Sequence, residues 1–431
     1  MRCSVALFAL ASLGILACSS ATTTTSATGA DGGSDAAATT LDPSGDAPAS
    51  CTSGAAGGSI PTPRGDTAGA LSPLADTLLM FGGDTATAPC GGAAAHTHAG
   101  DTWLLDVNCR VWREAKVDGP GARARHAIVA DPARGRALLF GGRSRAGASG
   151  AYTLFSDVWS FDFKTEAWEQ LATTGKAPKG RSNAATALDA TGNALVVFGG
   201  NASTSGLDFT PLADTWSLDL TTLAWTQIAT KSAPPARLFH AMAIDDKTRT
   251  AYVFSGGDAG AFTGPFLRDV WALDIAAASW SPIATSGETP TGRIKHGLAF
   301  DTTTGKLLTF GGHDDGAVGN QNDVYALDVG SGAWKRLPGG DVLHAPSTQA
   351  CVFAPDFTTI DVAAPERRSA FVFAPRADGH GFAVAQGVGD CGLLGDAYWF
   401  GAGTSAWSAL KPSPVGLSCL RAQTTCAGLC G

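Results

Sequence analysis

One spacing of aromatic residues is repeated six times along this chain of 431 residues, and it constrains the fold more than any other feature. In each copy an Asp is followed two residues later by Trp or Tyr and eleven residues later by Trp. Because the spacing within a copy is constant while the spacing between copies varies, the sequence predicts a repeat architecture. The copies begin at Asp101, Asp157, Asp214, Asp269, Asp323 and Asp396.

Each repeat carries further marks upstream of the Asp. An apolar run ends in a glycine pair at 82–83, 141–142, 199–200, 256–257 and 311–312. An Arg opens each repeat, and in three repeats a His follows it three residues later, at His126, His240 and His296. Short apolar runs separated by Asp- and Gly-rich turns predict four short strands per repeat. Such units bury their apolar faces by radial stacking, with the Trp side chains between them. The opening arginines are Arg64, Arg123, Arg181, Arg237, Arg293 and Arg368.

These residues resemble the kelch family of β-propellers, whose motif joins an Arg-x-x-His start, an apolar run ending in Gly-Gly, and a closing aromatic and Trp. The resemblance covers roughly Pro63 to Leu410. It implies an all-β fold over residues 60–412, a six-bladed propeller with four antiparallel strands per blade. The sixth repeat is degenerate, with Phe371 at the His position and 386–389 in place of a clean glycine pair. In the first repeat Thr67 stands at the His position.

The N-terminal residues predict export. Residues 1–17 have a charged start and a short apolar core, as a secretory signal does. Cys18 follows directly and resembles the lipidated Cys of bacterial lipoproteins; an ordinary cleaved signal is the alternative. Ser19 follows in place of the Asp that retains such lipoproteins at the inner membrane, so the expected location is the outer membrane or cell surface. Residues 18–59 are poor in large apolar side chains, which predicts a disordered tether.

Cysteine usage predicts disulfides. With Cys3 in the signal and Cys18 lipidated, eight of ten cysteines remain, an even number in an exported chain. Cys351 and Cys391 are expected in loops on one face and form the favoured pair. A bond from Cys51 to a Cys of the tail, residues 413–431, is the proposed ring closure, and the connectivity stays open. The eight candidates are Cys51, Cys90, Cys109, Cys351, Cys391, Cys419, Cys426 and Cys430.

Charge argues against nucleic acid as a partner. The formal net charge is −8, and Lys and Arg are scattered without a basic stripe. The expected partner is an unidentified envelope protein or glycan. Contact with the membrane is expected through the N-terminal lipid alone, and the propeller is expected to be monomeric.

The expected binding surface is the face that carries the loops between second and third strands and the links between blades. These segments hold nearly all the length variation, and variable loops on a rigid scaffold commonly bind ligands. The candidate residues on this face are His96, His98, Arg143, Arg145, Arg268, His313, Asp314 and Asp315.

Metal and catalytic chemistry are not predicted. His96 and His98 with Asp101 lack a clear third ligand, and the oxygen-rich segment 314–323 does not match a calcium loop. The Arg, His and Asp of the repeat recur in most blades. A catalytic group is needed once, so their recurrence favours structural roles as ion pairs and core residues. We therefore expect no catalytic residue, metal or cofactor.

Three functions stay open. The favoured one is a non-catalytic protein- or ligand-binding module at the bacterial envelope. The second is a carbohydrate-active enzyme similar to the kelch sialic-acid mutarotases, for which only Glu288 and Glu366 are expected near the loop face. The third is a purely structural surface protein. Chemistry similar to that of the copper radical oxidases is not expected, because Tyr152 is the only Tyr outside the repeat positions and buried strands.

Overall fold

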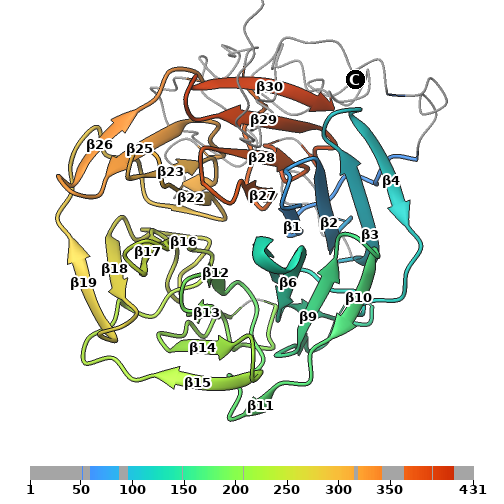
Figure 1. The fold of residues 1–431 in the computed structure, drawn as a ribbon, viewed down its shortest axis with the longest axis horizontal. Helices are drawn as coiled ribbons and strands as arrows, with labels where there is room; N and C mark the ends of the chain where they lie inside the picture. The colour runs from blue at the N-terminus through green and yellow to red at the C-terminus, as the bar shows by residue number, and fades with distance from the viewer. Residues whose placement is uncertain are drawn as a thin grey trace, which may run out of the picture. The chain divides into compact units, whose positions relative to one another are not determined.

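The computed structural model describes Cys51 and residues 59–86, 96–147, 149–206, 208–314, 319–341, 364–390 and 392–411. These residues form six antiparallel sheets that succeed one another around a central axis as the blades of a propeller (Figure 1). The propeller lies in a compact unit that spans Asp42–Gly431. The predicted all-β, six-bladed fold is therefore confirmed.

The four main strands of each blade come from one continuous stretch of the chain (Figure 1). Blades one and two contain β1 (Ala68–Leu71), β2 (Thr77–Asp84), β3 (His98–Asp106) and β4 (Val111–Ala115), then β5 (Ala127–Asp131), β6 (Arg136–Phe140), β9 (Val158–Asp162) and β10 (Ala167–Gln170). Blades three and four contain β12 (Ala185–Asp189), β13 (Ala194–Phe198), β14 (Thr215–Asp219) and β15 (Ala224–Ile228), then β16 (Ala241–Asp245), β17 (Thr250–Phe254), β18 (Val270–Asp274) and β19 (Ser279–Ile283). Blades five and six contain β22 (Gly297–Asp301), β23 (Lys306–Phe310), β25 (Val324–Asp328) and β26 (Ala333–Arg336), then β27 (Val372–Pro375), β28 (Gly381–Ala385), β29 (Ala397–Gly401) and β30 (Ala406–Lys411).

Short elements decorate this frame. β11 (Thr174–Gly175) and β20 (Ser286–Gly287) run parallel to the outermost strands β15 and β26. On the loop face β7 (Arg143–Ser144) pairs with β8 (Thr153–Leu154), and β21 (Arg293–Ile294) pairs with β24 (His313–Asp314). The only helical element among the described residues is a 3-10 turn at Pro132–Arg134.

The second Asp of each repeat folds the turn between third and fourth strands. Asp162 accepts hydrogen bonds from the backbone N–H groups of Lys164 and Thr165, at 2.9 and 2.7 Å. Asp219 does the same for Thr221 and Thr222 in blade three. Because the Asp side chain satisfies the free N–H groups of the tight turn, the residues of the turn itself are sufficient to specify its conformation.

The closing Trp of a repeat packs between two blades. The ring of Trp168 in blade two lies 5.3 Å from that of Phe81 in blade one, and Trp225 lies 5.6 Å from Phe140. The same contact recurs at Trp280–Phe198, Trp334–Phe254 and Trp407–Phe310. Each pair adds about 0.5–1.5 kcal/mol to the gain from burying the rings. The expected place of the Trp side chains between blades is confirmed.

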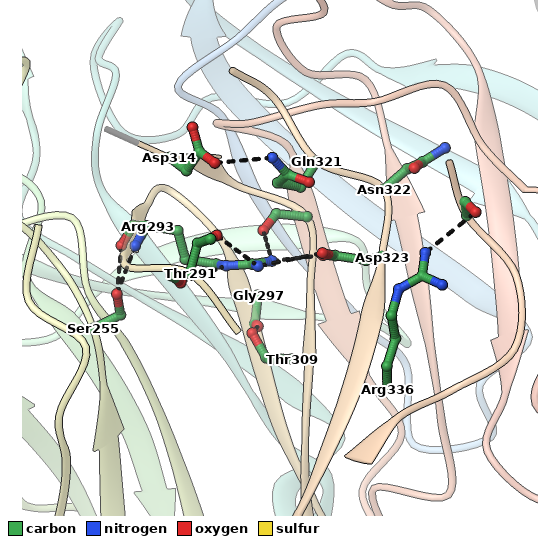
Figure 2. A network of polar contacts seen from close by, with 12 residues as sticks. Ser255, Thr291, Arg293, Gly297, Thr309, Asp314, Gln321, Asn322, Asp323 and Arg336 are labelled. Atoms are coloured by element: carbon green, nitrogen blue, oxygen red, sulfur yellow. Dashed lines mark hydrogen bonds and ion pairs between the residues drawn. The ribbon is translucent and has the colours of Figure 1, made fainter. Parts of the chain in front are cut away.

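The opening Arg, which is buried, and the motif Asp form one ion pair in every blade. In blade two, Nη1 and Nη2 of Arg123 donate to the carboxylate oxygens of Asp157 at 2.7 and 3.0 Å, and Nη1 also donates to the Gly141 carbonyl. Figure 2 shows the blade-five pair, Arg293 with Asp323. This satisfied, bidentate geometry is the kind that offsets the cost of burying a charge. The structural role predicted for these residues is confirmed.

The glycine pair marks a backbone turn with two consecutive positive φ angles. In blade two Gly141 and Gly142 have φ of 68° and 98°, and a Cβ on Gly142 would lie 2.8 Å from the Cβ of His126. In blade four Ser255 and Gly256 occupy these positions, with φ of 58° and 102°. The pair expected at 256–257 is therefore shifted by one residue. The Ser255 hydroxyl accepts the Arg293 N–H at 2.8 Å (Figure 2).

The three motif histidines are core residues that stay neutral. Burial, helped by the charge of Arg123, lowers the pKa of His126 to about 3. Burial likewise lowers the pKa of His296 to about 3 and that of His240 well below its usual value. Each ring packs against a Phe in the second strand of the preceding blade. In blade six Phe371 takes the same place against Phe310.

The disulfide of the described residues joins Cys51 to Cys109, with Cα atoms 5.5 Å apart. Cys109 lies in the turn between β3 and β4, so this bond fastens the segment before the propeller to blade one itself. The expected bond from Cys51 to the tail is therefore wrong. A turn between strands and a segment 58 residues upstream carry no sequence signal of their proximity. Cys90, Cys351, Cys391 and the tail cysteines lie outside the described residues.

The predicted signal, lipidation site and tether also lie outside the described residues, apart from Cys51 and Ser59. Within the described ranges, the structure has no helix that is both long and apolar enough to span a membrane.

Candidate functional site

The third residue of each repeat, two after the opening Arg, belongs to a closed ring of backbone hydrogen bonds. The N–H of Arg125 donates to the carbonyl of Asp66 in the preceding blade at 2.8 Å, and the other five positions repeat this bond at 2.9–3.2 Å. All six residues have left-handed φ angles between 51° and 59°. We call this set the axial ring: Asp66, Arg125, Asn183, Phe239, Lys295 and Ala370.

The side chains of the axial ring differ in every blade. Its backbone bonds are the same all round, so the fold needs the same backbone at each position but no particular side chain. The opening Arg, two residues earlier, is identical in all six repeats because it has a structural partner in each. The axial ring therefore contains one acidic, two basic, one amide, one aromatic and one methyl side chain. Nothing in its backbone hydrogen bonds requires these side chains to differ from blade to blade.

Asp66 is the acidic residue of this ring and pairs with both of its basic residues. Its carboxylate accepts a hydrogen bond from Nε of Arg125 at 2.7 Å and contacts Nζ of Lys295 at 3.0 Å. Burial by itself raises the pKa of Asp66, but the two cations more than offset it and hold the pKa well below its usual range. Burial lowers the pKa of Lys295, although Asp66 opposes this shift. The three groups form a charged triad with one excess positive charge.

An aromatic wall stands beside the triad. Lys295 Nζ lies 5.1 Å from the ring centroid of Phe239 and 5.5 Å from that of Phe262, within the range of cation–π attraction. The rings of Phe209 and Phe262 meet at 5.1 Å, and both contact Phe239. Phe262 is 51% exposed, which is unusual for a Phe and leaves an apolar surface open to a ligand.

A second cluster surrounds Tyr152 in the loop of blade two. The guanidinium carbons of Arg143 and Arg145 lie 3.8 and 4.5 Å from its ring centroid. The rings of His96 and His98, from blade one, contact the same ring edge-on. The backbone of Arg143 pairs with that of Ala124, which sets this cluster next to Arg125 of the axial ring.

Blade one adds a carboxylate to this cluster. His96 Nδ1 pairs with Asp84. Burial raises the pKa of Asp84, but the hydrogen bond from His96 outweighs it, so the pKa is lower than usual. Burial lowers the pKa of His98, and the charge of Arg143 adds to this.

We call the combined surface the mouth. It consists of the axial ring with Asp84, Arg143, Arg145, Tyr152 and Phe262. Arg125, Arg143, Arg145 and Lys295 carry four positive charges against the two negative charges of Asp66 and Asp84, an excess of two. A partly buried surface of this sign attracts anionic groups.

Four of the eight residues predicted from the loops meet in the mouth or at its edge, namely His96, His98, Arg143 and Arg145. The others have separate places. Arg268 donates to the Pro290 carbonyl at 3.3 Å, and His313 pairs with Asn320 at 3.3 Å. Asp314 is buried and accepts from Gln321 (Figure 2), while Asp315 lies outside the described residues.

Sequence reasoning missed the axial ring. Its residues lie between the Arg and His of the motif, and they were overlooked because this motif was interpreted as structural. They include Asp66, Arg125, Phe239 and Lys295. A usable signal existed, because the position is flanked by constant residues and differs in every repeat.

The structure also places the residues considered for chemistry. Glu288 accepts the N–H of Arg336 in the outermost strand β26, away from the axial ring. The carboxylate of Asp101 is bound by Arg64 and Trp103, so it is not available beside His98 as a ligand. Across the described ranges, no group of three His, Cys, Asp or Glu side chains is arranged to hold a metal ion.

Comparison with known proteins gives consistent matches. The family model KLHDC2/KLHL20/DRC7 Kelch-repeats domain matches residues 47–248, 147–362 and 229–428. Kelch domain-containing protein 10 of Homo sapiens is 28% identical over 230 residues, which are 51% of this chain and 48% of that protein. This chain thus spans about half the length of such relatives.

Two plant proteins also match. N-(sulfonatooxy)prop-2-enimidothioate sulfolyase of Thlaspi arvense is 30% identical over 262 residues, 56% of this chain and 70% of that protein. Acyl-CoA-binding domain-containing protein 4 of Arabidopsis thaliana is 29% identical over 250 residues, 57% of this chain and 35% of that protein. These relatives differ widely in their named activities, so the matches indicate a shared scaffold rather than a shared function.

Proposed function

Because the chain belongs to the kelch-repeat family, we propose that it is a non-catalytic interaction module that binds a segment of a partner protein in its mouth. The rigid ring of blades supplies the scaffold, and the axial ring and blade-two loop supply the recognition surface. The bound segment presents an acidic group to the cations of the mouth and an apolar side chain to Phe239 and Phe262.

The observation that carries this proposal is the variety of the axial ring. Six positions with the same backbone geometry hold six different side chains. Interactions that only hold blades together recur in every blade, as the Arg–Asp pairs do. A surface that breaks the repeat where the blades converge is therefore best explained by recognition of an asymmetric ligand.

We further propose that the module works outside the cytoplasm, anchored through lipid on Cys18 and held on the tether of residues 18–59. The support is the signal-like sequence before Cys18 and the low apolar content after it. Mass spectrometry of the N-terminal peptide tests this anchoring. A diacylglyceryl-type mass on Cys18, lost in Cys18→Ser, is expected, and an unmodified Cys18 in the mature protein contradicts it.

Binding in the mouth is tested by chemical cross-linking of the native protein, followed by identification of the partner. Phe239→Ala with Lys295→Ala removes one wall of the mouth, and we expect it to abolish capture of the partner. Lys164→Ala, in the β9–β10 turn at the opposite end of a blade, is the matched control and keeps capture intact. Equal capture by both variants contradicts the proposed site.

A further inference from the structure

Arg143 is a buried arginine without the partner that the other buried arginines have. Its residue is 2% exposed, and its Nε and Nη1 atoms have no hydrogen-bond partner within the described part of the chain. The opening arginines are buried to the same degree, but each is bound by an Asp in its own blade, as Arg123 is by Asp157. A buried guanidinium whose donors are unused is costly, so it calls for a specific explanation.

Further unused polar atoms lie around the same tyrosine. The hydroxyl of Tyr152, Nε of Arg145 and Nδ1 of His98 are also buried without a hydrogen-bond partner among the described residues. Both arginines stack on the Tyr152 ring, and His98 contacts its edge. Five unsatisfied polar atoms thus gather in one place, and the three that belong to arginine can only donate. What is missing from the cluster is an acceptor.

The fold itself does not need Arg143. The backbone bridge that Arg143 makes with Ala124 recurs in the other blades, where the side chain at this position is different. The equivalent residues are Asp84, Asn201, Gly257, His313 and Val388. A side chain that the repeat does not require, and whose donors are left unused, points to a ligand.

The nearby carboxylates are already engaged. Asp66 is bound by Arg125 and Lys295, and Asp84 by His96. Burial lowers the pKa of Arg143 to about 10, so the guanidinium remains charged at neutral pH. Its charge is therefore balanced only at a distance, and an anion that entered the cluster would meet a preorganised set of donors.

We infer that Arg143, with Arg145 and the hydroxyl of Tyr152, forms a binding site for one oxyanion, a carboxylate or phosphate group, at the edge of the mouth. This inference rests on the proposed function, because the group is supplied by the bound partner segment. Tyr152 holds the Arg143 guanidinium in place by stacking, and its hydroxyl donates a hydrogen bond to the anion. A side-chain carboxylate and a phosphate ester share this chemistry, and direct titration separates them.

The test is NMR of the arginine Nε–H groups in the full chain labelled with ¹⁵N-arginine. Sodium acetate and inorganic phosphate are titrated separately at constant ionic strength, with chloride as the balancing ion. We expect one saturable shift, assigned to Arg143 by its absence in Arg143→Gln. Loss of the charged hydrogen bonds should weaken anion binding, measured by isothermal titration calorimetry, by about tenfold or more in that variant. Arg113→Gln, which removes an exposed arginine paired with Glu166, is the matched control and leaves the shift unchanged.

The two arms identify the source of the anion. A shift with acetate alone assigns the site to a carboxylate, and a stronger shift with phosphate assigns it to a phosphate ester. If neither anion moves the Arg143 resonance, the inference is overturned. Tyr152→Phe keeps the stacked ring and removes the hydroxyl, so unaltered anion affinity in this folded variant also contradicts the role given to Tyr152.

The outcome is distinguishable from that of the proposed function. If anions bind at Arg143 but partner capture does not depend on Phe239 and Lys295, the anion site stands and the interaction proposal fails. If partner capture depends on the mouth but neither anion shifts the Arg143 resonance, the interaction proposal stands and this inference fails.

Discussion

The backbone N–H of Asp66 in blade one donates a hydrogen bond of 2.9 Å to the carbonyl of Ala370 in blade six. Beside it, the N–H of Gly387 donates to the Arg64 carbonyl, also at 2.9 Å. Every other pair of adjacent blades is joined by the same two bonds. The propeller is thus closed by repeating its own blade-to-blade contact, although each blade is made from consecutive strands and none is exchanged across the closure.

Gly387→Ala should weaken this closure. Gly387 has φ of 117°, and a Cβ there would lie 2.8 Å from the Cβ of Phe371 and 3.1 Å from the Ser369 carbonyl oxygen. Strain of this kind costs about 1–3 kcal/mol. We expect urea denaturation to show a loss of unfolding free energy of this size.

Two glycines serve as controls for Gly387→Ala. Gly135 has a positive φ but open space around it, so Gly135→Ala isolates the backbone strain. Gly121→Ala also meets nothing within 4 Å and lacks the positive φ, so it should be close to neutral. Equal stability of all three variants would refute the close packing assigned to the closure.

The buried histidines should make the propeller sensitive to acid. The pKa values of His126 and His296 are about 3 in the folded protein and 6.5 when exposed, so the unfolded chain binds more protons between these values. The histidines' contribution to stability is present above pH 6.5 and is lost as the pH falls toward 3. Each histidine should contribute a slope of up to about 1.4 kcal/mol per pH unit.

Blade six supplies the substitution that tests this effect, because Phe371 stands where the histidines stand. Replacement of His126, His240 and His296 by Phe should flatten the fall in unfolding free energy between pH 6.5 and 4. Denaturation curves at several pH values measure it. An unchanged slope would show that the histidines do not titrate in the unfolding transition.

Asp157→Ala should be strongly destabilising, because it leaves the Arg123 guanidinium buried without its carboxylate. Removal of one partner from a buried ion pair costs about 3–5 kcal/mol. Glu166→Gln is the contrasting variant, since it breaks an exposed pair with Arg113 that is worth about 0–1 kcal/mol. The melting temperature of Asp157→Ala should be clearly lower than that of Glu166→Gln. Similar melting temperatures would contradict the importance given to the six Arg–Asp pairs.

Peptide mapping of the oxidised protein under non-reducing conditions should recover Cys51 linked to Cys109. Because the bond closes a loop with a sequence separation of 58 residues, Cys109→Ser should lower the unfolding free energy by about 2–4 kcal/mol. Recovery of Cys51 linked to a cysteine of residues 413–431 would instead favour closure of the ring by a disulfide.

The fold could be predicted because its determinants recur. The pairing of Arg123 with Asp157 was predictable because equivalent residues occur in every repeat. The place of Trp168 between blades was predictable for the same reason. Even Phe371 was readable as a replacement of the motif His. Ser255 shows the limit of this approach, because the adjacent Gly256 and Gly257 look like the expected pair and only the backbone angles show which residues occupy the turn.

The site was only partly predictable for the same reason. Arg143 and Arg145 were found because they lie in a variable loop, but Asp66 and Lys295 lie inside the repeated motif and were concealed by it. Their meeting depends on closure of the ring, which brings together residues 229 positions apart in sequence. No local pattern encodes that contact.

The most direct test of the account is site-specific photo-cross-linking in the native cells. A photoreactive amino acid at Phe262, the exposed aromatic residue of the mouth, should cross-link to a partner protein. The same group at Lys164, on the opposite face, should not. Addition of Arg143→Gln to the Phe262 probe should reduce the yield. Cross-linking from position 164 but not from position 262 would contradict the claim that the mouth is the binding site.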